Sequence, residues 1–492
     1  MRYIYFIRLK IKPTTSTSLP MATSGEGNGV AASLHICMFP FLAFGHISPF
    51  AQLSRKLLSA AGVRITFLTA AGNVPRVAAL LPSSPSISVV PLHLPPIPGL
   101  PAGAESTAEV SAAGAELLKL AFDETKPQVS ALLRDLLPDV VLIDFSHPWV
   151  GSITAPLGIK TLLFSVFAAV STAFLMVPSR ASSSLSSLSS PPEGFPTSSA
   201  IKSIPTYQAA DFSYVFKSFN GRPSVFDSLT ACIENCDGVV IKTCLEMEKS
   251  YVEYIERQYN KKILLAGPLV PEPPPQGELE PRWRDWLGGF PHGSVVFSSF
   301  GSETFLTDEA AAELLLGLEE SGQPFLVVLN FPKEGEQVDI RKRLPDGFLE
   351  RVEGRGTVHS GWVQQQRILR HRAVGCFLCH AGFSSVVEGL LADCQLVMLP
   401  QKGDQYLNAK LFAAELGIGV EVERRDEDGW FGRAAVSKAV REVMVKEEEE
   451  EEEEGKREKH KKWREFFTDE EVQTKFTLEF VESLKELAAA AE

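Results

Sequence analysis

Residues 362–405 read WVQQQRILRHRAVGCFLCHAGFSSVVEGLLADCQLVMLPQKGDQ. Within this stretch an apolar run over residues 375–379 precedes a helix-period segment over residues 384–392, and a second apolar run leads into Pro400. A short apolar run, a helix and another short run are typical of a parallel α/β sheet. We therefore expect a strand, a helix and a strand in this order.

The same alternation extends over almost the whole chain. Short apolar runs that we predict to be strands cover residues 34–39, 64–69, 139–143, 160–164, 238–243, 263–266, 294–300, 324–329 and 357–363. A chain of 492 residues is too long for one hydrophobic core. We therefore predict an α/β protein with two doubly wound domains.

The proline-rich stretch PLVPEPPPQGELEP marks the division between these domains. We expect a first domain over residues 33–267, a linker over 268–283, a second domain over 284–455 and C-terminal helices over 456–492 that pack across both domains. Residues 1–32 are expected to be a disordered extension, because their apolar run is too short for a signal peptide. A start at Met21 and a weak organelle-targeting segment stay open as alternatives. The Ser- and Pro-rich tract over 181–200 is predicted to be a surface loop.

Composition excludes several classes of protein. A formal net charge of −13, much of it from residues 447–454, argues against nucleic-acid binding, which needs a basic face. No run reaches the roughly 18 apolar residues of a membrane span. Seven cysteines, an odd number, indicate a reducing compartment and not a disulfide framework. We therefore expect a cytoplasmic protein that acts as a monomer.

A phosphate site is predicted where the first run of the quoted stretch ends. His380 follows this run, and Gly382 stands just before the expected helix. Backbone amides at a helix N-terminus attract an anion, and a glycine lets the anion come close. Glu388 lies one turn into the helix, where an acid commonly accepts hydrogen bonds from ribose hydroxyls. The segment is thus suited to a nucleotide.

Both ends of the quoted stretch carry side chains suited to the rest of a nucleotide sugar. Trp362 offers a flat apolar face for a base, with Gln365 three residues on, while Asp404 and Gln405 suit sugar hydroxyls. Taken singly, a tryptophan at a strand end is usually a core residue and an Asp-Gln pair is usually a helix cap. The combination is what favours a nucleotide-sugar site.

The stretch resembles the signature of plant family 1 UDP-glycosyltransferases. The matching residues are Trp362, Gln365, His371, Val374, Gly375, Phe377, His380, Gly382, Ser385, Glu388, Pro400, Asp404 and Gln405. The resemblance covers nearly the whole chain, and it implies the GT-B architecture of two facing Rossmann-like domains. It also implies a UDP-sugar co-substrate, a small phenolic acceptor bound in the N-terminal domain, and neither a metal nor another cofactor.

The resemblance assigns a role to each site residue. It implies that Trp362 stacks on uracil, that the Val363 backbone pairs with its edge, and that Gln365 and Glu388 hold ribose. The residues implied at the diphosphate and beside the sugar are Ser302, His380, Gly382, Ser384 and Ser385. The transferred sugar is expected at Asp404 and Gln405.

A general base is needed, because an attacking hydroxyl must lose its proton in the transition state. His46 is the candidate, expected in a loop over residues 41–47 before a helix that Ser48 caps and Pro49 opens. Asp144, after the strand over 139–143, can fix the imidazole tautomer and stabilise the imidazolium. The pair resembles the family's catalytic dyad. His147 is a rival base that we rank lower.

Departures from the family pattern bear on the sugar. Ala381, Phe383 and Ser384 stand where most members carry Cys, Trp and Asn, and Gln364 stands where Pro is usual. Gln405 is typical of enzymes that use UDP-glucose, so glucose is expected, with xylose and rhamnose open. The motifs look closest to the branch that acts on flavonoids and anthocyanins, either on the 3-hydroxyl or on an existing 3-O-sugar.

The sequence also carries partial motifs of other functions. The acidic triplet over residues 426–428 is expected to be a solvated turn and not a metal site. A nucleophile elbow would need a glycine in place of Val386, and the first strand is not followed by Gly-x-Gly-x-x-Gly, which argues against a hydrolase and a dehydrogenase. A nucleotide-sugar-binding homologue without catalysis, UDP-sugar hydrolysis, and transfer to another plant acceptor such as a terpenoid stay open.

Overall fold

The computed structural model describes residues 33–181, 184–219, 221–272, 274, 277–301, 304–331, 340–444 and 455–490. The predicted disordered extension over residues 1–32 lies outside the described residues, as does the acidic run over 447–454.

The first half of the chain folds around a parallel sheet of seven strands. Its strands are β1 (Leu34–Phe39), β2 (Val63–Ala70), β3 (Ile87–Leu92), β4 (Val140–Ile143), β5 (Lys160–Ser165), β6 (Gly238–Ile241) and β7 (Ile263–Leu265). They lie in the order β3-β2-β1-β4-β5-β6-β7, and each adjacent pair is parallel. The chain therefore reverses its direction of winding between β1 and β4.

The second half repeats this plan with six strands. These are β8 (Val295–Ser299), β9 (Phe325–Val328), β10 (Gly356–His359), β11 (Val374–Cys379), β12 (Gln395–Met398) and β13 (Val420–Glu421). They lie in the parallel order β10-β9-β8-β11-β12-β13. Here the winding reverses between β8 and β11. The prediction of two Rossmann-like, doubly wound domains is confirmed.

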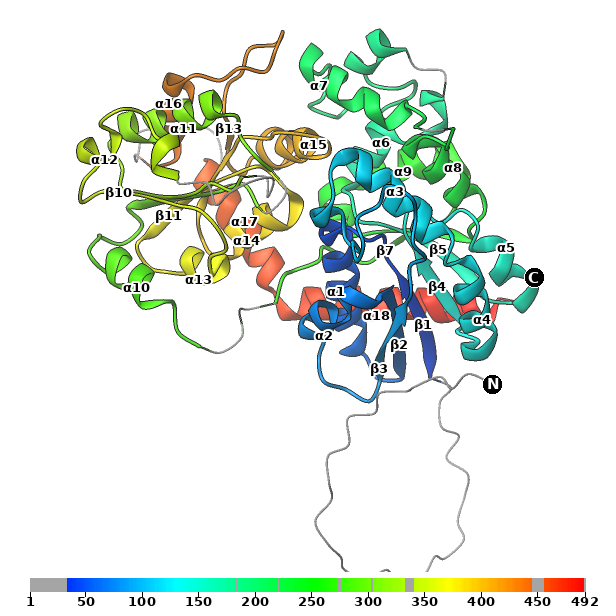
Figure 1. Cartoon of the computed structure of the whole chain (residues 1–492). Coiled ribbons are helices and arrows are strands. Elements are labelled where there is room, and N and C mark those ends of the chain that lie inside the picture. Colours follow the sequence, from blue (N-terminus) through cyan, green and yellow to red (C-terminus); the bar gives the residue numbers. More distant parts are fainter. Residues whose placement is uncertain are drawn as a thin grey trace, which may run out of the picture.

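Helices pack against the sheets of both domains (Figure 1). Those of the first half are α1 (Phe44–Leu58), α2 (Val74–Leu80), α3 (Ala112–Asp123), α4 (Lys126–Leu136), α5 (Gly151–Thr154), α6 (Ala169–Leu175), α7 (Thr206–Phe212), α8 (Val225–Glu234) and α9 (Leu245–Tyr259). Those of the second half are α10 (Pro281–Gly288), α11 (Asp308–Ser321), α12 (Phe348–Arg351), α13 (Gln365–Leu369), α14 (Phe383–Leu391), α15 (Gln405–Ala409) and α16 (Arg433–Met444).

The last two helices together contact both domains. Helix α17 (Lys456–Thr468) lies against the second domain, where His460 Nε2 is 2.9 Å from the Cys394 carbonyl oxygen. Helix α18 (Glu470–Ala489) runs along the first domain, as Figure 1 shows, and buries Phe480 and Leu484 in the same core cluster as β1 and α1. The C-terminus thus returns to the domain that starts the chain.

Most described residues of the Ser- and Pro-rich tract are exposed or half-buried, as expected of a surface loop, but some of its side chains anchor it in the core. Leu188 and Phe195 are only 2% and 8% exposed and belong to the core. The buried Arg180 donates to the carbonyl oxygens of Ser187 at 2.9 Å and Ser190 at 2.7 Å. A guanidinium has five donors, so it can satisfy the carbonyls of a segment that has little regular structure of its own.

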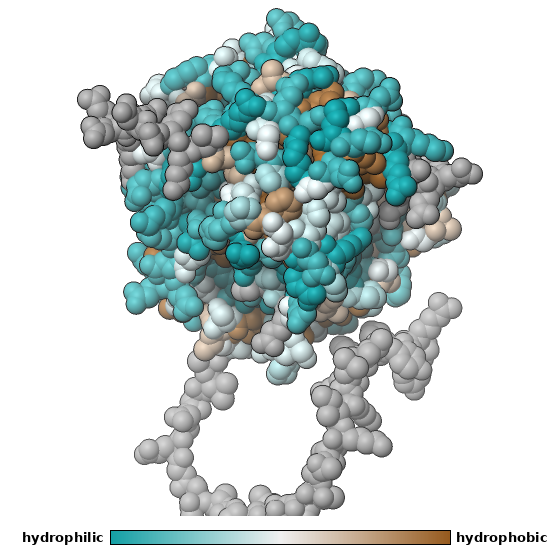
Figure 2. All heavy atoms as spheres, turned by 90° about the vertical axis from the view of Figure 1, so that its left-hand side faces the viewer, coloured by the Kyte–Doolittle hydropathy of each residue, from teal (hydrophilic) through white to brown (hydrophobic). Residues whose placement is uncertain are grey.

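The outer surface is mainly polar. Figure 2 shows a largely hydrophilic face over the second domain, with smaller apolar areas between the polar side chains. None of the helices in the described ranges combines the length and hydropathy that a membrane span requires.

Candidate active site

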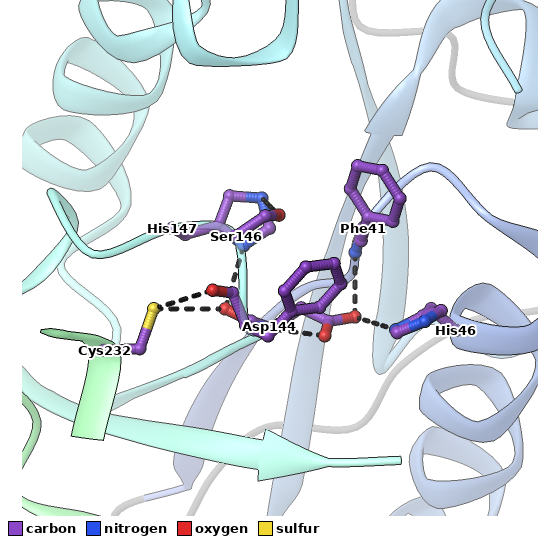
Figure 3. Close-up of polar contacts among 7 residues, drawn as sticks. Phe41, His46, Asp144, Ser146, His147 and Cys232 are labelled. Carbon is purple, nitrogen blue, oxygen red and sulfur yellow. Dashed lines mark hydrogen bonds and ion pairs between the residues drawn. The ribbon is translucent and has the colours of Figure 1, made fainter. Parts of the chain in front are cut away.

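The first part of the site lies where the winding of the first sheet reverses. His46 is in the first turn of α1, which follows β1, and Asp144 follows β4 directly. The His46 Nδ1 atom is 2.8 Å from Asp144 Oδ2, as Figure 3 shows. Ligands of open α/β sheets bind at this carboxyl edge of the strands. We call His46 and Asp144 the base corner.

The base corner corrects the predicted start of the first helix. Helix α1 begins at Phe44, so His46 lies in a helix and not in a loop, and Ser48 and Pro49 fall inside the helix. Asp144 Oδ2 also accepts a 3.0 Å hydrogen bond from the Phe41 backbone amide, which fixes the chain just before α1. A proline this close to a helix start removes few backbone hydrogen bonds, so the helix continues through it.

Asp144 is held as a carboxylate. It is 2% exposed, and its second oxygen accepts a 2.8 Å hydrogen bond from the Phe145 amide. Burial by itself would raise the pKa of Asp144, but the charge and hydrogen bond of His46, together with the Phe41 amide, lower it. A carboxylate at Nδ1 keeps the proton on that nitrogen, so Nε2 of neutral His46 is free to take a proton.

The rival His147 lies in a different environment. It is 0% exposed, its Nδ1 atom lies 3.3 Å from the Asp144 backbone oxygen, and its ring packs in a tilted arrangement against Phe39, with the ring centres 4.2 Å apart. Burial lowers the pKa of His147 to about 4. The structure therefore pairs the Asp144 carboxylate with His46, while His147 is a neutral core residue (Figure 3).

The second part of the site lies where the winding of the second sheet reverses. His380 follows β11, and Gly382 is the N-cap of α14 without a side-chain cap. Two glycines make room for the imidazole: a Cβ atom on Gly382 would lie 2.6 Å from Nε2, and one on Gly301 would lie 3.2 Å from Cε1. Ala381, between His380 and Gly382, has a φ of 59°, which turns the chain into the helix.

His380 is suited to an anion as a neutral donor. Its Nδ1 atom is buried and makes no hydrogen bond of ordinary geometry within the described part of the chain. Burial and the nearby charge of Lys402 lower the pKa of His380 to about 4. Ser384 and Ser385 lie in the first turn of α14, beside its open amides, whereas Ser302 lies outside the described residues. The helix N-terminus and His380 can together hold a diphosphate.

Glu388, the predicted ribose ligand, connects α14 to the start of α13. Its carboxylate accepts 2.7 Å and 3.1 Å hydrogen bonds from the side-chain amides of Gln365 and Gln366. Burial raises the pKa of Glu388, which the two amide donors partly offset. Gln366 was missed from the sequence, although its position beside Gln365 at the start of α13 was a usable signal. We call His380, Gly382, Glu388 and Gln365 the donor corner.

Trp362 and Val363 lie between β10 and α13. The strand ends at His359, not at residue 363 as predicted, because Gly361 has a φ of 101° that breaks the extended backbone. Trp362 is 78% exposed, which leaves its ring face open to a base, while the Val363 side chain is 7% exposed. A flat exposed indole is suited to stacking on a planar ring.

Asp404 and Gln405 start α15. Asp404 Oδ2 accepts a 2.9 Å hydrogen bond from the Asn408 amide, which also donates to the Ala381 carbonyl oxygen at 3.1 Å. Gln405 Oε1 accepts from the amides of Gln401 at 2.9 Å and Lys402 at 3.2 Å, so only its NH₂ group is left for a sugar. Asn408 was missed, although it lies four residues after Asp404 on the same helix.

The two domains meet around Asp404. The Gly403 amide donates to Asp211 Oδ2 of the first domain at 2.9 Å, and Phe212 packs edge-on against Tyr406 at 5.8 Å. Burial raises the pKa of Asp404, while Asn408, Lys242 and then His46 act to lower it. His46 and Asp404 are thus close enough to interact electrostatically across the domain interface.

Comparison with known proteins places the chain in a family. A family model described as UDP-glucoronosyl and UDP-glucosyl transferase matches residues 286–451. Anthocyanidin-3-O-glucoside rhamnosyltransferase of Petunia hybrida is 50% identical over 464 residues, 93% of this chain and 97% of that enzyme. Anthocyanidin 3-O-glucoside 2'''-O-xylosyltransferase of Arabidopsis thaliana is 39% identical over 470 residues, 94% of this chain and 98% of that enzyme.

A crystal structure of Arabidopsis thaliana UGT89C1 complexed with UDP-L-rhamnose superimposes with a TM-score of 0.72 and 25% identity, over 93% of this chain and 100% of that one. Fold, site geometry and sequence similarity agree on one class of enzyme. The chain belongs to the UDP-glycosyltransferase family and is a GT-B enzyme that transfers a glycosyl group from a UDP-sugar.

Proposed function

We propose that the enzyme transfers a sugar from UDP to a hydroxyl of a flavonoid 3-O-glucoside, with inversion at the anomeric carbon. The observation that carries this proposal is the 2.8 Å pair of His46 and Asp144, which interacts electrostatically with Asp404 of the second domain. A single displacement needs a general base with a free nitrogen on one side of the reacting carbon and a site that holds the sugar on the other.

In the proposed reaction the acceptor oxygen attacks the anomeric carbon as its proton moves to His46 Nε2. The bond from the anomeric carbon to the β-phosphate oxygen breaks, and UDP leaves with the electron pair. Asp144 stabilises the imidazolium that forms. His380 and the amides at the start of α14 stabilise the charge that develops on the diphosphate. This scheme uses neither a metal ion nor another cofactor.

For the donor we propose UDP-glucose, on the strength of Gln405. UDP-rhamnose is the second candidate, because the Petunia hybrida relative at 50% identity is a rhamnosyltransferase. Phe383 and Ser384, where most family members carry Trp and Asn, flank this part of the site, so the hydroxyl contacts can differ from those of glucose users.

For the acceptor we propose the sugar of the 3-O-glucoside and not the aglycone, because both relatives described above are named for anthocyanidin 3-O-glucosides. Transfer to the flavonoid 3-hydroxyl and transfer to a terpenoid are the alternatives. We also propose that the enzyme works in the cytoplasm as a monomer. All seven cysteines are unpaired and buried, in keeping with a reducing compartment.

The test pairs UDP-glucose, UDP-rhamnose and UDP-xylose with a flavonol, its 3-O-glucoside, an anthocyanidin 3-O-glucoside and a terpenoid alcohol. Products are identified by mass spectrometry and NMR. Transfer to a 3-O-glucoside with an inverted linkage is the expected result. Transfer only to aglycones or terpenoids would contradict the acceptor, and free sugar without any acceptor product would indicate hydrolysis. Binding of UDP without turnover would indicate a non-catalytic homologue, and loss of activity with a chelator would contradict the metal-free scheme.

A further inference from the structure

Lys242 is a buried cation that the scheme above leaves unused. It follows β6 at the carboxyl edge of the first sheet, the edge that also carries Asp144. The residue is 4% exposed, and its Nζ atom lies 4.5 Å from the centre of the Phe383 ring of the second domain. Lys242 therefore reaches across the domain interface to the first residue of α14.

The two carboxylates near Lys242 accept hydrogen bonds from other residues. Glu248 accepts hydrogen bonds from the backbone amides of Ala169 at 3.1 Å and Val170 at 2.7 Å, at the start of α6. Asp404 accepts from Asn408. Both carboxylates interact electrostatically with Lys242, yet neither forms an ion pair with it within 4.0 Å among the residues that the structure describes. The ammonium thus keeps hydrogen-bond donors that no described carboxylate takes up.

The surroundings of Lys242 are those of the transferred sugar. Asp404, a predicted sugar ligand, interacts electrostatically with Lys242 and with His46, so all three residues lie near the interface of the two domains. Phe383 stands where most family members carry Trp, and the ammonium rests on this ring. An ammonium over an aromatic face and beside a carboxylate is a polar group held at a fixed position, which suits the recognition of a neutral polyol.

We propose that Lys242 donates a hydrogen bond to a hydroxyl of the sugar carried by UDP, and so makes the acceptor domain a specificity determinant for the donor. The inference rests on the proposed function, since it takes the sugar to lie at Asp404 and Gln405. Removal of one charge-assisted hydrogen bond should weaken binding of the sugar part roughly tenfold to hundredfold.

The experiment compares the affinity for UDP with the affinity for UDP-glucose, UDP-rhamnose and UDP-xylose, by titration calorimetry on the full-length enzyme. The ratio of the two affinities isolates the sugar contribution. In Lys242→Met this ratio should change roughly tenfold or more for at least one donor sugar, while UDP binds as in the wild type. UDP-xylose lacks the hydroxymethyl group, so a loss confined to UDP-glucose would identify the 6-hydroxyl as the partner.

Lys56→Met is the matched control. Lys56 is a half-buried lysine of the first domain whose Nζ atom is buried, 5.6 Å from a phenylalanine ring, but that ring is Phe476 on α18. Lys56→Met should leave every affinity ratio unchanged. If Lys242→Met gives wild-type ratios for all three sugars, the proposal is wrong. If it also loses UDP binding, Lys242→Gln is measured, and equal loss of UDP and UDP-sugar binding in both variants would show a structural role and overturn the proposal.

Failure of this proposal and failure of the proposed function can be told apart. The affinity ratios need neither an acceptor nor turnover. A wild-type enzyme that transfers nothing to flavonoid glucosides would contradict the acceptor while leaving the Lys242 measurement intact. Normal transfer to flavonoid glucosides together with unchanged affinity ratios in Lys242→Met would contradict the role of Lys242 and leave the proposed function intact.

Discussion

The base corner and the donor corner occupy equivalent places in two similar sheets, but they are held together differently. In the base corner each partner is a side chain or amide of the same domain, and the Asp144 carboxylate accepts hydrogen bonds from His46, Phe41 and Phe145. In the donor corner Glu388 accepts from Gln365 and Gln366, but the first turn of α14 has no side-chain cap. His380 Nδ1 makes no hydrogen bond of ordinary geometry within the described residues.

This difference fits the roles that we propose for the two corners. A general base must keep one orientation through the reaction, so it is fixed by direct hydrogen bonds. A diphosphate brings its own charge and a nucleobase brings its own flat surface. Their site therefore needs backbone donors and space for the ligand. We therefore expect substitutions in the base corner to reduce turnover, and substitutions in the donor corner to reduce nucleotide affinity.

The largest expected effect is that of His46→Ala. Loss of the base should lower kcat about 10³-fold, because no other imidazole contacts the Asp144 carboxylate in the described structure. Initial rates by mass spectrometry measure this, with UDP titration as the control for an intact donor corner. A rate within tenfold of the wild type would remove His46 from the mechanism.

Asp144→Asn should lower kcat about 10²-fold with little change in UDP affinity. An amide cannot stabilise an imidazolium as a carboxylate does. The NH₂ group of the asparagine is a donor, and it would face another donor, either the Phe145 amide or those that now bond Oδ2. The melting temperature should therefore fall as well. Asp237→Asn is a control, since Asp237 accepts from the Thr161 amide at the opposite edge of the sheet. Equal rate losses in both variants would argue against a specific role for Asp144.

His147 makes the base corner sensitive to acid. Its pKa is about 4 in the folded enzyme, against 6.5 for an ordinary histidine in the unfolded chain, so the unfolded chain binds the proton more tightly. The stability contributed by neutral His147 is complete above pH 6.5 and is lost as pH falls toward 4; it amounts to about 2 kcal/mol between pH 7 and pH 5. Urea unfolding should show this loss in the wild type and a smaller loss in His147→Asn. Parallel pH profiles would contradict the assignment.

The smallest expected effect lies in the donor corner. Gly382→Ala would place a Cβ atom 2.6 Å from His380 Nε2, so the imidazole must move. UDP affinity should fall about tenfold, while kcat at saturating donor changes little. Gly288→Ala is the matched control, because a Cβ atom there meets nothing within 4 Å. A fall in kcat at unchanged UDP affinity would reverse the proposed division between the two corners.

Much of this organisation was predictable from the sequence. The strands and their turns carry local signals, so the alternation predicted both sheets except their edge strands β3 and β13. It also placed His46, Asp144, His380 and Glu388 near strand or helix ends. What escaped depends on distant partners. The start of α1 depends on hydrogen bonds from a residue about 100 positions away, and the packing of the Ser-rich tract depends on Arg180. Lys242 carries no motif, and only the approach of the second domain gives it a ring to contact.

The path of the last helix sets an order of assembly. Phe480, Val481 and Leu484 complete the core that contains β1, the first strand of the chain. During synthesis the first domain therefore keeps part of its apolar interior uncovered until α18 has left the ribosome. A fragment that ends before α18 should aggregate, and a C-terminal fusion needs a spacer that lets α18 dock.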